Sequence, residues 1–312
     1  MRAIAYTMET IWRELTVITS LDAADSVANR LMEFGAHGTI SEDLPDKPTH
    51  CQVIAYYPDT PEVDLLIEEL RTYLRELQAL DLTPDQGEIV SKRVPEIDWQ
   101  SQWKQHFKPT RIGNRLVIKP SWESWQPQPD DIVIELDPGM AFGTGLHAST
   151  RLALRFLERY LHPGDAVLDV GVGSGILSIA AARLGATYVF GFDVDADAAA
   201  IAQENVRRNA TAFPQDPPLD AIIEVQTGSI DTLEILRKFD CIVMNIRPNI
   251  ILPLVPYALT YLQTGGALIL SGILEEEGSE FLDHLRPCDL IVQNYDTEAG
   301  WIAYVCSQLH WE

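Results

Sequence analysis

The residues best suited to chemistry stand directly after short apolar runs, where the strands of a parallel sheet would end. They are Gly171, Gly173, Gly175, Asp193 and Asn245. Closely spaced glycines allow a backbone to approach a ligand, and an acid at the next strand end accepts hydrogen bonds from ribose hydroxyls. The pattern predicts a nucleoside site at one edge of a sheet.

The elements that position the glycines and the acid form one continuous stretch. An apolar run, Ala166–Val170, leads into the glycines, and a small-residue helical run, Ile176–Leu184, follows them. A second apolar run, Tyr188–Phe192, ends in Asp193. This order of strand, glycine turn, helix, strand and acid predicts a βαβ unit that holds a nucleoside. A tight turn without a ligand is the alternative.

Length, charge and cysteine spacing restrict the class of protein. The 312 residues carry 23 Lys and Arg against 46 Asp and Glu, a net charge of −23. Such acidity disfavours binding to duplex nucleic acid and would attract a basic protein, although it could serve solubility alone. The four cysteines lack the spacing of a metal site, and neither a signal peptide nor a membrane span is evident. We expect a cytoplasmic protein of two domains without a bound metal.

Residues 1–94 predict a small α+β domain. Strands are expected over 12–18, 39–40, 52–57 and 88–94, and helices from Asp22, as the capping residue, to Phe34 and from Pro61 to Leu77. This βαββαβ order is typical of a ferredoxin-like domain. We interpret it as a substrate-recognition domain, with a stabilising appendage as the alternative. Residues 95–110 predict a helical interdomain linker, because Trp99, Trp103 and Phe107 recur every four residues.

A second glycine loop precedes the βαβ unit. It reads D-P-G-M-A-F-G-T-G-L-H-A-S-T over residues 137–150, and Ser149 and Thr150 begin the next predicted helix. Their hydroxyls and the free amides of a first helical turn can hold a carboxylate, or they can simply cap the helix. Two glycine loops, each at a helix N-terminus, make a ligand site the stronger interpretation.

These two motifs carry a family resemblance. The loop at 137–150, followed by L-D-V-G-V-G-S-G-I-L-S-I-A-A-A-R-L-G-A at 168–186, resembles the bacterial ribosomal protein L11 methyltransferase family (PrmA). The resemblance implies that residues 111–312 form a class I methyltransferase domain, Rossmann-like α/β, with a seven-stranded, mostly parallel sheet whose last strand is antiparallel. It also implies a basic ribosomal protein of the large subunit as substrate. The cofactor contacts it implies are Thr150, Gly171, Asp193 and Asn245, to which Gly173 of the same turn is added.

The spacing of the glycines favours S-adenosylmethionine as the nucleoside. A dinucleotide site usually reads G-x-G-x-x-G, whereas this turn reads G-x-G-x-G with Ile176 at the place of the third glycine. Asp193 does not decide between the two ligands, because a dinucleotide enzyme also uses such an acid. The additional loop ending at Thr150 favours a methyltransferase. No G-x-x-x-x-G-K-[ST] motif for ATP is present.

Asn245 is the predicted catalytic residue. It begins N-I-R-P at the end of a buried strand, where its carbonyl could accept from an acceptor amine and direct the nitrogen lone pair at the methyl group. A turn residue closing the strand is the alternative. No dedicated base is evident, and His147 is expected to be structural. Arg247 and Pro248 depart from the family's usual N-I-L-A, which leaves open another protein or small amine as substrate. A cofactor-binding module without turnover is a third alternative.

Overall fold

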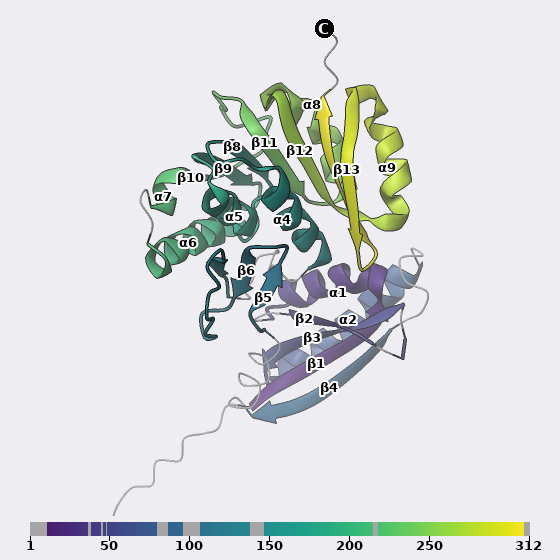
Figure 1. Ribbon diagram of the computed structural model, residues 1–312. Coiled ribbons are helices and arrows are strands. Elements are labelled where there is room, and N and C mark those ends of the chain that lie inside the picture. Colours follow the sequence, from purple (N-terminus) through teal and green to yellow (C-terminus); the bar gives the residue numbers. More distant parts are fainter. Residues whose placement is uncertain are drawn as a thin grey trace, which may run out of the picture. The chain divides into compact units, whose positions relative to one another are not determined.

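The chain is organised as two compact units. The computed structural model describes residues 11–36, 39–44, 46–47, 49–79, 87–95, 107–137, 147–214 and 218–308. Among these residues, the first unit ends at Phe107 and the second begins at Lys108. Each unit is shown as a ribbon in Figure 1. Residues 96–106 of the predicted linker helix lie outside the described residues, whereas Pro95 ends a strand of the first unit and Thr110 begins one of the second.

The first unit is a four-stranded antiparallel sheet with two helices. Its elements are β1 Ile11–Ser20, α1 Leu21–Glu33, β2 Thr39–Asp43, β3 His50–Pro58, α2 Pro61–Ala79 and β4 Glu88–Pro95, and the strand order is β2-β3-β1-β4. Alternate β1 residues such as Leu15 and Val17 are buried with Leu31 of α1 and Leu70 of α2. The element order is the predicted βαββαβ. The recognition role of this unit stays a prediction.

One predicted helix cap in this unit is wrong. The side chain of Ser20 accepts a hydrogen bond of 3.3 Å from the backbone amide of Ala23, so Ser20, and not Asp22, caps α1. The reason is that β1 continues through Ser20 and leads directly into the helix. The end of α1 is as predicted, because Gly35 follows it with a φ of 87°.

The second unit contains a seven-stranded sheet. Its strands are β8 Ala166–Val170, β9 Tyr188–Asp193, β10 Ile223–Thr227, β11 Phe239–Asn245, β12 Leu262–Leu274, β13 Leu290–Glu298 and β14 Trp301–Gln308. Their order is β10-β9-β8-β11-β12-β14-β13, and β14 is antiparallel to both of its neighbours. The remaining pairs are parallel. The predicted class I methyltransferase fold, with an antiparallel last strand, is confirmed.

Helices cover both faces of this sheet (Figure 1). The helices of the second unit are α4 Ala148–Tyr160, α5 Ile176–Leu184, α6 Ala196–Ala212, α7 Leu219–Ile222, α8 Pro248–Tyr261 and α9 Gly278–Leu285. One core joins α4 and α5 to alternate strand residues such as Val167 and Val243. The other joins α8 and α9 to intervening residues such as Leu168 and Met244. The alternation arises because successive strand residues point to opposite faces.

A small three-stranded sheet precedes the large one. Its strands are β5 Thr110–Ile112, β6 Leu116–Lys119 and β7 Ile132–Glu135. Asn209 of α6 exchanges two hydrogen bonds with the backbone of Glu135, at 2.9 and 2.7 Å, and so fixes β7 against the main helical layer. The strand β5 was not predicted, because its three residues include a single apolar side chain, Ile112.

Three boundaries in the second unit differ from those that the apolar pattern predicts. The pattern predicts a helix over 253–262, but α8 begins at Pro248, because a proline is compatible with the first helical turn, where its missing N–H is not needed. The pattern predicts a strand from Ile222, but Ile222 belongs to α7. It predicts a helix over 274–285, but Leu274 ends β12 and Glu275–Glu277 form a short 3₁₀ turn, so α9 begins at Gly278. None of the described helices has the length and apolarity that crossing a bilayer demands.

Candidate cofactor and acceptor site

The glycine turn after β8 is formed by residues with positive φ. The values are 78° for Gly171, 50° for Gly173 and 81° for Gly175, a region in which side chains are strained. A Cβ on Gly171 would also lie 2.6 Å from Cγ2 of Ile246, which follows Asn245. The turn therefore requires glycine at position 171 for two independent reasons, and it lies beside the end of β11.

The carboxylate of Asp193 is held at the end of β9 by backbone amides. Gly173 donates to Oδ2 at 3.0 Å and Asp195 donates to Oδ1 at 3.1 Å. No Lys or Arg of the described residues forms an ion pair with Asp193. The next residue, Val194, is 75% exposed. At the end of β9, the Asp193 carboxylate is thus an oriented hydrogen-bond acceptor, and the exposed apolar side chain of Val194 follows it in the chain.

The side chain of Asn245 is buried at the end of β11 and is only half satisfied. Its amide nitrogen donates to the hydroxyl of Thr150 in α4 at 3.1 Å. Its Oδ1 atom is buried and accepts from no group in the described part of the chain. Thr150 is itself fully buried. The structure therefore brings these two predicted site residues into direct contact and leaves one amide oxygen without a donor.

A second buried oxygen without a partner belongs to Asp169 of β8. The Ser178 hydroxyl donates to its Oδ2 at 2.7 Å, whereas Oδ1 has no partner among the described residues. Complete burial, with a smaller contribution from the charge of Asp193, raises the pKa of Asp169 to about 7 despite the Ser178 bond. Asp169 is opposite Val243 in the sheet, two residues before Asn245, so Asp169 and Asn245 lie on the same face.

These acceptors define the ligand that the site can hold. Asp169, Asn245 and Asp193 all offer oxygen atoms that accept hydrogen bonds. Such a set fits a ligand that brings N–H and O–H donors and positive charge, and it does not fit the pyrophosphate of a dinucleotide at the same atoms. The ammonium, sulfonium and ribose hydroxyls of S-adenosylmethionine match it. Within the described ranges, no cluster of His, Cys, Asp and Glu could hold a metal ion.

The first turn of α4 is connected to two strands. Besides the Thr150 contact, the hydroxyl of Ser271, which lies opposite Asn245 in β12, donates to the backbone carbonyl of Ser149 at 2.8 Å. The His147 ring lies 2.8 Å from the Ser149 hydroxyl through Nδ1 and packs edge-on against Trp301, with ring centroids 4.6 Å apart. These contacts support the structural role expected of His147.

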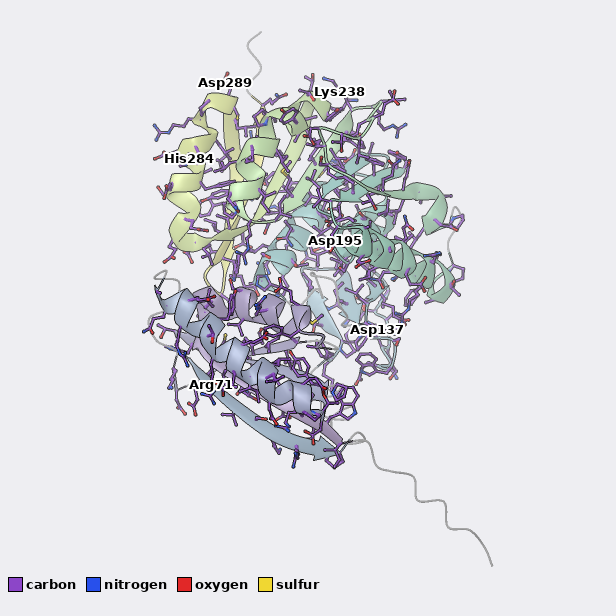
Figure 2. All side chains as sticks on the ribbon, turned by 180° about the vertical axis from the view of Figure 1, so that it is seen from behind. Arg71, Asp137, Asp195, Lys238, His284 and Asp289 are labelled. Atoms are coloured by element: carbon purple, nitrogen blue, oxygen red, sulfur yellow. The ribbon has the colours of Figure 1, made fainter. Side chains whose placement is uncertain are left out.

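The first residue of the glycine loop at 137–150 is anchored by several contacts. Asp137 accepts from the backbone amide of Ser121 at 2.6 Å and from its hydroxyl at 2.9 Å, and it pairs with Arg208 of α6. Burial disfavours its charge, but these bonds lower the pKa of Asp137 overall. Figure 2 labels Asp137 and also Asp195, which caps α6. Residues 138–146 of the loop lie outside the described residues.

Ion pairs hold the β13–β14 hairpin against α4. Glu298 pairs with Arg151 and with Arg155, both at 2.5 Å, and Asp296 pairs with Arg155 at 3.1 Å. Partial burial disfavours the charge of Glu298, but the two arginines lower its pKa overall. The hairpin and the helix that carries Thr150 are therefore fastened to each other beside the site.

The structure explains in part why Arg247 and Pro248 replace the usual Leu and Ala of the family's N-I-L-A pattern. Pro248 occupies the first position of α8, and the carbonyl of Arg247 accepts from the amides of Ile250 and Ile251 at 3.0 Å. The side chain of Arg247 is exposed and forms no ion pair with a described acid. An exposed guanidinium, unpaired with any acid that the structure describes, therefore lies two residues along the chain from Asn245.

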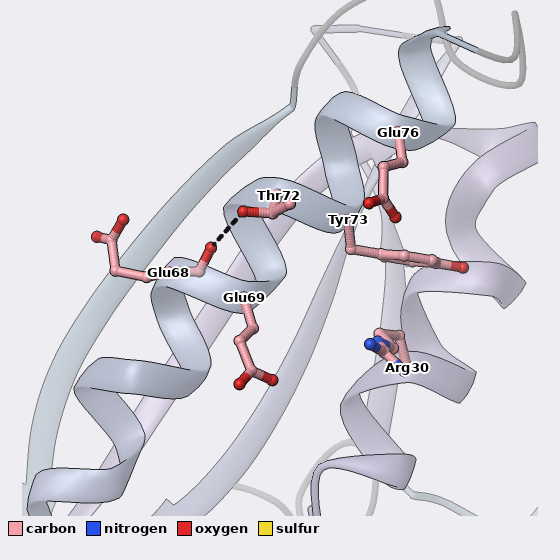
Figure 3. Close-up of a pocket in the computed structure, with 6 residues that line it drawn as sticks. All are labelled: Arg30, Glu68, Glu69, Thr72, Tyr73 and Glu76. Carbon is pink, nitrogen blue, oxygen red and sulfur yellow. Dashed lines mark hydrogen bonds between the residues drawn. The ribbon is translucent and has the colours of Figure 1, made fainter.

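A separate groove lies between α1 and α2 of the first unit (Figure 3). Its volume is about 330 Å³, and it is lined by Arg30, Glu68, Glu69, Thr72, Tyr73 and Glu76. Arg30 pairs with Glu33 at 2.8 Å and lies over the rings of Phe34 and Tyr73. None of the predicted site residues lines this groove, and its carboxylates are exposed to solvent.

Comparisons with known proteins agree with this geometry. The family model described as ribosomal protein L11 methyltransferase (PrmA) matches residues 11–308. The chain belongs to this family. It is 36% identical to a ribosomal protein L11 methyltransferase of Listeria monocytogenes, over 94% of this chain and 98% of that protein. It is 38% identical to one of Pelotomaculum thermopropionicum, over 94% and 97%.

A solved structure supports the same conclusion. The ribosomal protein L11 methylase of Lactobacillus delbrueckii subsp. bulgaricus is 33% identical and superimposes with a TM-score of 0.57, over 65% of this chain and all of that one. Membership of the PrmA family confirms the predicted enzyme class, an S-adenosylmethionine-dependent protein methyltransferase. The individual site residues stay predictions.

Sequence reasoning missed part of the site. Asp169 lies two residues before Gly171, but no role was predicted for it, and neither Ser178 nor Val194 was singled out. A signal for Asp169 was present, because an acid inside an otherwise apolar buried strand needs a partner or a ligand. The exposure of Val194 had no such signal, since it depends on how α6 leaves the strand end.

Proposed function

We propose that this PrmA-family enzyme transfers methyl groups from S-adenosylmethionine to amino groups, chiefly lysine side chains, of large-subunit ribosomal protein L11. The observation that carries the proposal is the buried Oδ1 of Asn245 at the end of β11, which accepts from no donor among the residues that the structure describes. The relatives in the comparisons are named for methylation of L11. The net charge of −23 suits a basic protein as the partner.

Residues at two strand ends and in the first turn of α4 would hold the cofactor. Gly171 and Gly173 allow the backbone to pass beneath it, and Asp193 would accept from its ribose hydroxyls. Thr150 stays a predicted contact from the first turn of α4. When bound, S-adenosylmethionine supplies an electrophilic methyl group on a positively charged sulfur.

Asp169 balances positive charge at this site. Its carboxyl is buried, its pKa is raised to about 7, and Oδ1 has no donor in the described part of the chain. A nearby positive charge would favour the ionised carboxylate and lower that pKa again. Asp169 therefore favours a cationic ligand over a neutral one, and it would be ionised when such a ligand is held.

Asn245 would orient the acceptor amine. Its Oδ1 can accept one N–H of a neutral amine, which leaves the nitrogen lone pair directed elsewhere, toward the methyl group. A lysine must lose a proton first, which costs about 4 to 5 kcal/mol at pH 7 from a pKa of about 10.4. Removal of the amine from water and a neighbouring positive charge both reduce that cost.

Transfer of labelled methyl groups to purified L11 tests the proposal. We expect incorporation with the full-length enzyme, and a loss of about 100-fold or more in Asn245→Ala and in Asp193→Ala. Asp197→Ala is the matched control, because Asp197 is an exposed acid in the first turn of α6. Full activity in both site variants contradicts the site assignment.

A second candidate is methylation of another protein or of a small amine. The exposed guanidinium of Arg247 beside the proposed acceptor position favours it, because a cation there could exclude a lysine ammonium or bind an acidic group. Incubation with a cell extract lacking endogenous methylation separates the candidates by the size of the labelled product. If calorimetry shows that the cofactor binds, but no S-adenosylhomocysteine is released with any acceptor, the protein would instead be a cofactor-binding module without turnover.

A further inference from the structure

The first turn of α4 makes two buried polar contacts with neighbouring strands. Thr150 contacts Asn245 of β11 through side chains at 3.1 Å, and Ser149 contacts Ser271 of β12 through its backbone carbonyl at 2.8 Å. Asn245 and Ser271 are direct neighbours in the sheet. Thr150, Ser149 and Ser271 are fully buried. The two contacts lie next to each other, but they involve different groups of their strand residues: a side-chain amide in Asn245 and a hydroxyl in Ser271.

Only the Thr150 contact sets the direction of a functional group. A primary amide has a donor end and an acceptor end, so engaging the donor end determines where the oxygen points. With the Asn245 nitrogen on the Thr150 hydroxyl, Oδ1 is the end that no described residue engages. If the amide rotated by half a turn, N–H groups would take the place of Oδ1 and would repel the N–H of an acceptor amine.

We infer that Thr150 is a positioning residue, which acts through Asn245 by holding the side-chain amide with Oδ1 toward the acceptor amine. The inference rests on the proposed function and assigns the Thr150 hydroxyl to Asn245, which leaves the predicted cofactor contact to the backbone amides of the same turn. The hydroxyl is suited to it because α4 carries it beneath the sheet edge, where water does not compete for the amide. Thr150 itself does not touch the acceptor in this arrangement.

Kinetics of four full-length variants test the inference. Thr150→Val keeps the shape and removes the hydroxyl, Thr150→Ser keeps the hydroxyl, and Ser271→Ala removes the neighbouring contact only. We expect kcat to fall about 10- to 100-fold in Thr150→Val, with the cofactor Kd within about 3-fold of wild type. Thr150→Ser and Ser271→Ala should keep kcat within about 3-fold. Adding Thr150→Val to Asn245→Ala should cause no further loss beyond about 2-fold.

Other kinetic outcomes overturn the inference. A cofactor Kd that rises in Thr150→Val as much as kcat falls would assign the hydroxyl to the cofactor. An equal loss of kcat in Ser271→Ala would indicate a general structural effect of the helix turn. Additive losses in the double variant would show that Thr150 does not act through Asn245.

A measurement without turnover separates this inference from the proposed function. The side-chain NH₂ resonances of Asn245, identified by their loss in Asn245→Ala, should exchange slowly with solvent in the unliganded enzyme. They should exchange at least about 10-fold faster in Thr150→Val and remain slow in Ser271→Ala. Equal exchange in wild type and Thr150→Val overturns the inference even if L11 is methylated. If exchange is slow in wild type and fast in Thr150→Val but L11 is not methylated, the inference about Thr150 stands and only the choice of substrate is overturned.

Discussion

Asp169 accepts a hydrogen bond of 2.7 Å from the Ser178 hydroxyl, and this bond satisfies only one of its two carboxyl oxygens. The carboxyl group is completely buried between β9 and β11, below the glycine turn. Burial raises its pKa to about 7. Below about pH 7 the unliganded enzyme therefore holds a proton on a residue whose charge a cationic ligand would favour, and two predictions depend on this.

The first prediction concerns the stability of the unliganded enzyme. The folded state binds the Asp169 proton more tightly than the unfolded chain does, because the pKa rises from 3.8 to about 7. Stability attributable to this group is therefore complete below about pH 4 and is lost as the pH rises toward 7, by about 4 kcal/mol in total. Asp169→Asn should remove that loss, so its stability relative to wild type should increase between pH 4 and pH 8. Chemical denaturation over this pH range measures it, and parallel curves for the two proteins would contradict the prediction.

The second prediction concerns the cofactor. If a cationic ligand ionises Asp169, binding releases a proton below about pH 7 and affinity increases as the pH rises from 5 to 7. Titration calorimetry with S-adenosylmethionine in buffers of different ionisation enthalpy measures the released proton. Asp169→Asn should bind more weakly and release none. Affinity that does not change with pH in the wild-type enzyme would rule out this coupling.

The third prediction concerns the glycine turn. Gly171→Ala combines a positive φ with a Cβ placed 2.6 Å from Ile246, whereas Gly164→Ala has a φ of 103° but nothing within 4 Å. Backbone strain alone should cost about 1 to 2 kcal/mol in each variant. The contact with Ile246 should add about 1 to 3 kcal/mol in Gly171→Ala and weaken cofactor binding as well. Thermal unfolding and calorimetry compare the two variants, and equal losses would show that the close contact is relieved without cost.

The fourth prediction concerns the hairpin beside the site. Glu298→Gln weakens two ion pairs whose side chains are mostly shielded from solvent. The pKa of Glu298 is lowered overall, so this stabilisation is present above its ordinary pKa of 4.5 and is lost as the pH falls. We expect a loss of about 1 to 2 kcal/mol at pH 7 that disappears near pH 3. Asp283→Asn, which weakens an exposed pair with Arg286, is the control and should change stability little. A loss that persists at pH 3 would point to packing and not to charge.

The centre of the fold could be predicted from the sequence because its signals are local. The bounds of β8 and α5 were predicted to the residue, since a buried apolar strand, three glycines and a run of small residues each restrict the backbone strongly. Helix α8 was placed five residues too late, because Pro248 starts a helix as readily as it interrupts one. The βαββαβ order of elements in the first unit could be predicted from strand composition, helical spacing and turn residues.

The state of individual site atoms could not be predicted in this way. Asn245 and Asp193 were found because strand ends can be recognised from composition. That Oδ1 of Asn245 and Oδ1 of Asp169 both lack partners depends on the packing of α4 and α5 against the sheet, which places Thr150 and Ser178 on the other atoms. Such pairings join residues far apart in sequence and have no local signal.

Mass spectrometry of intact L11 tests the central claim most directly. Ribosomal protein L11 should be isolated from cells that contain this enzyme, from cells that lack it, and from cells that contain Asn245→Ala in its place. We predict L11 heavier by whole methyl groups only in the presence of the wild-type enzyme, and an unmodified mass in the other two. Unmodified L11 with the wild-type enzyme, or full methylation with Asn245→Ala, would contradict the account.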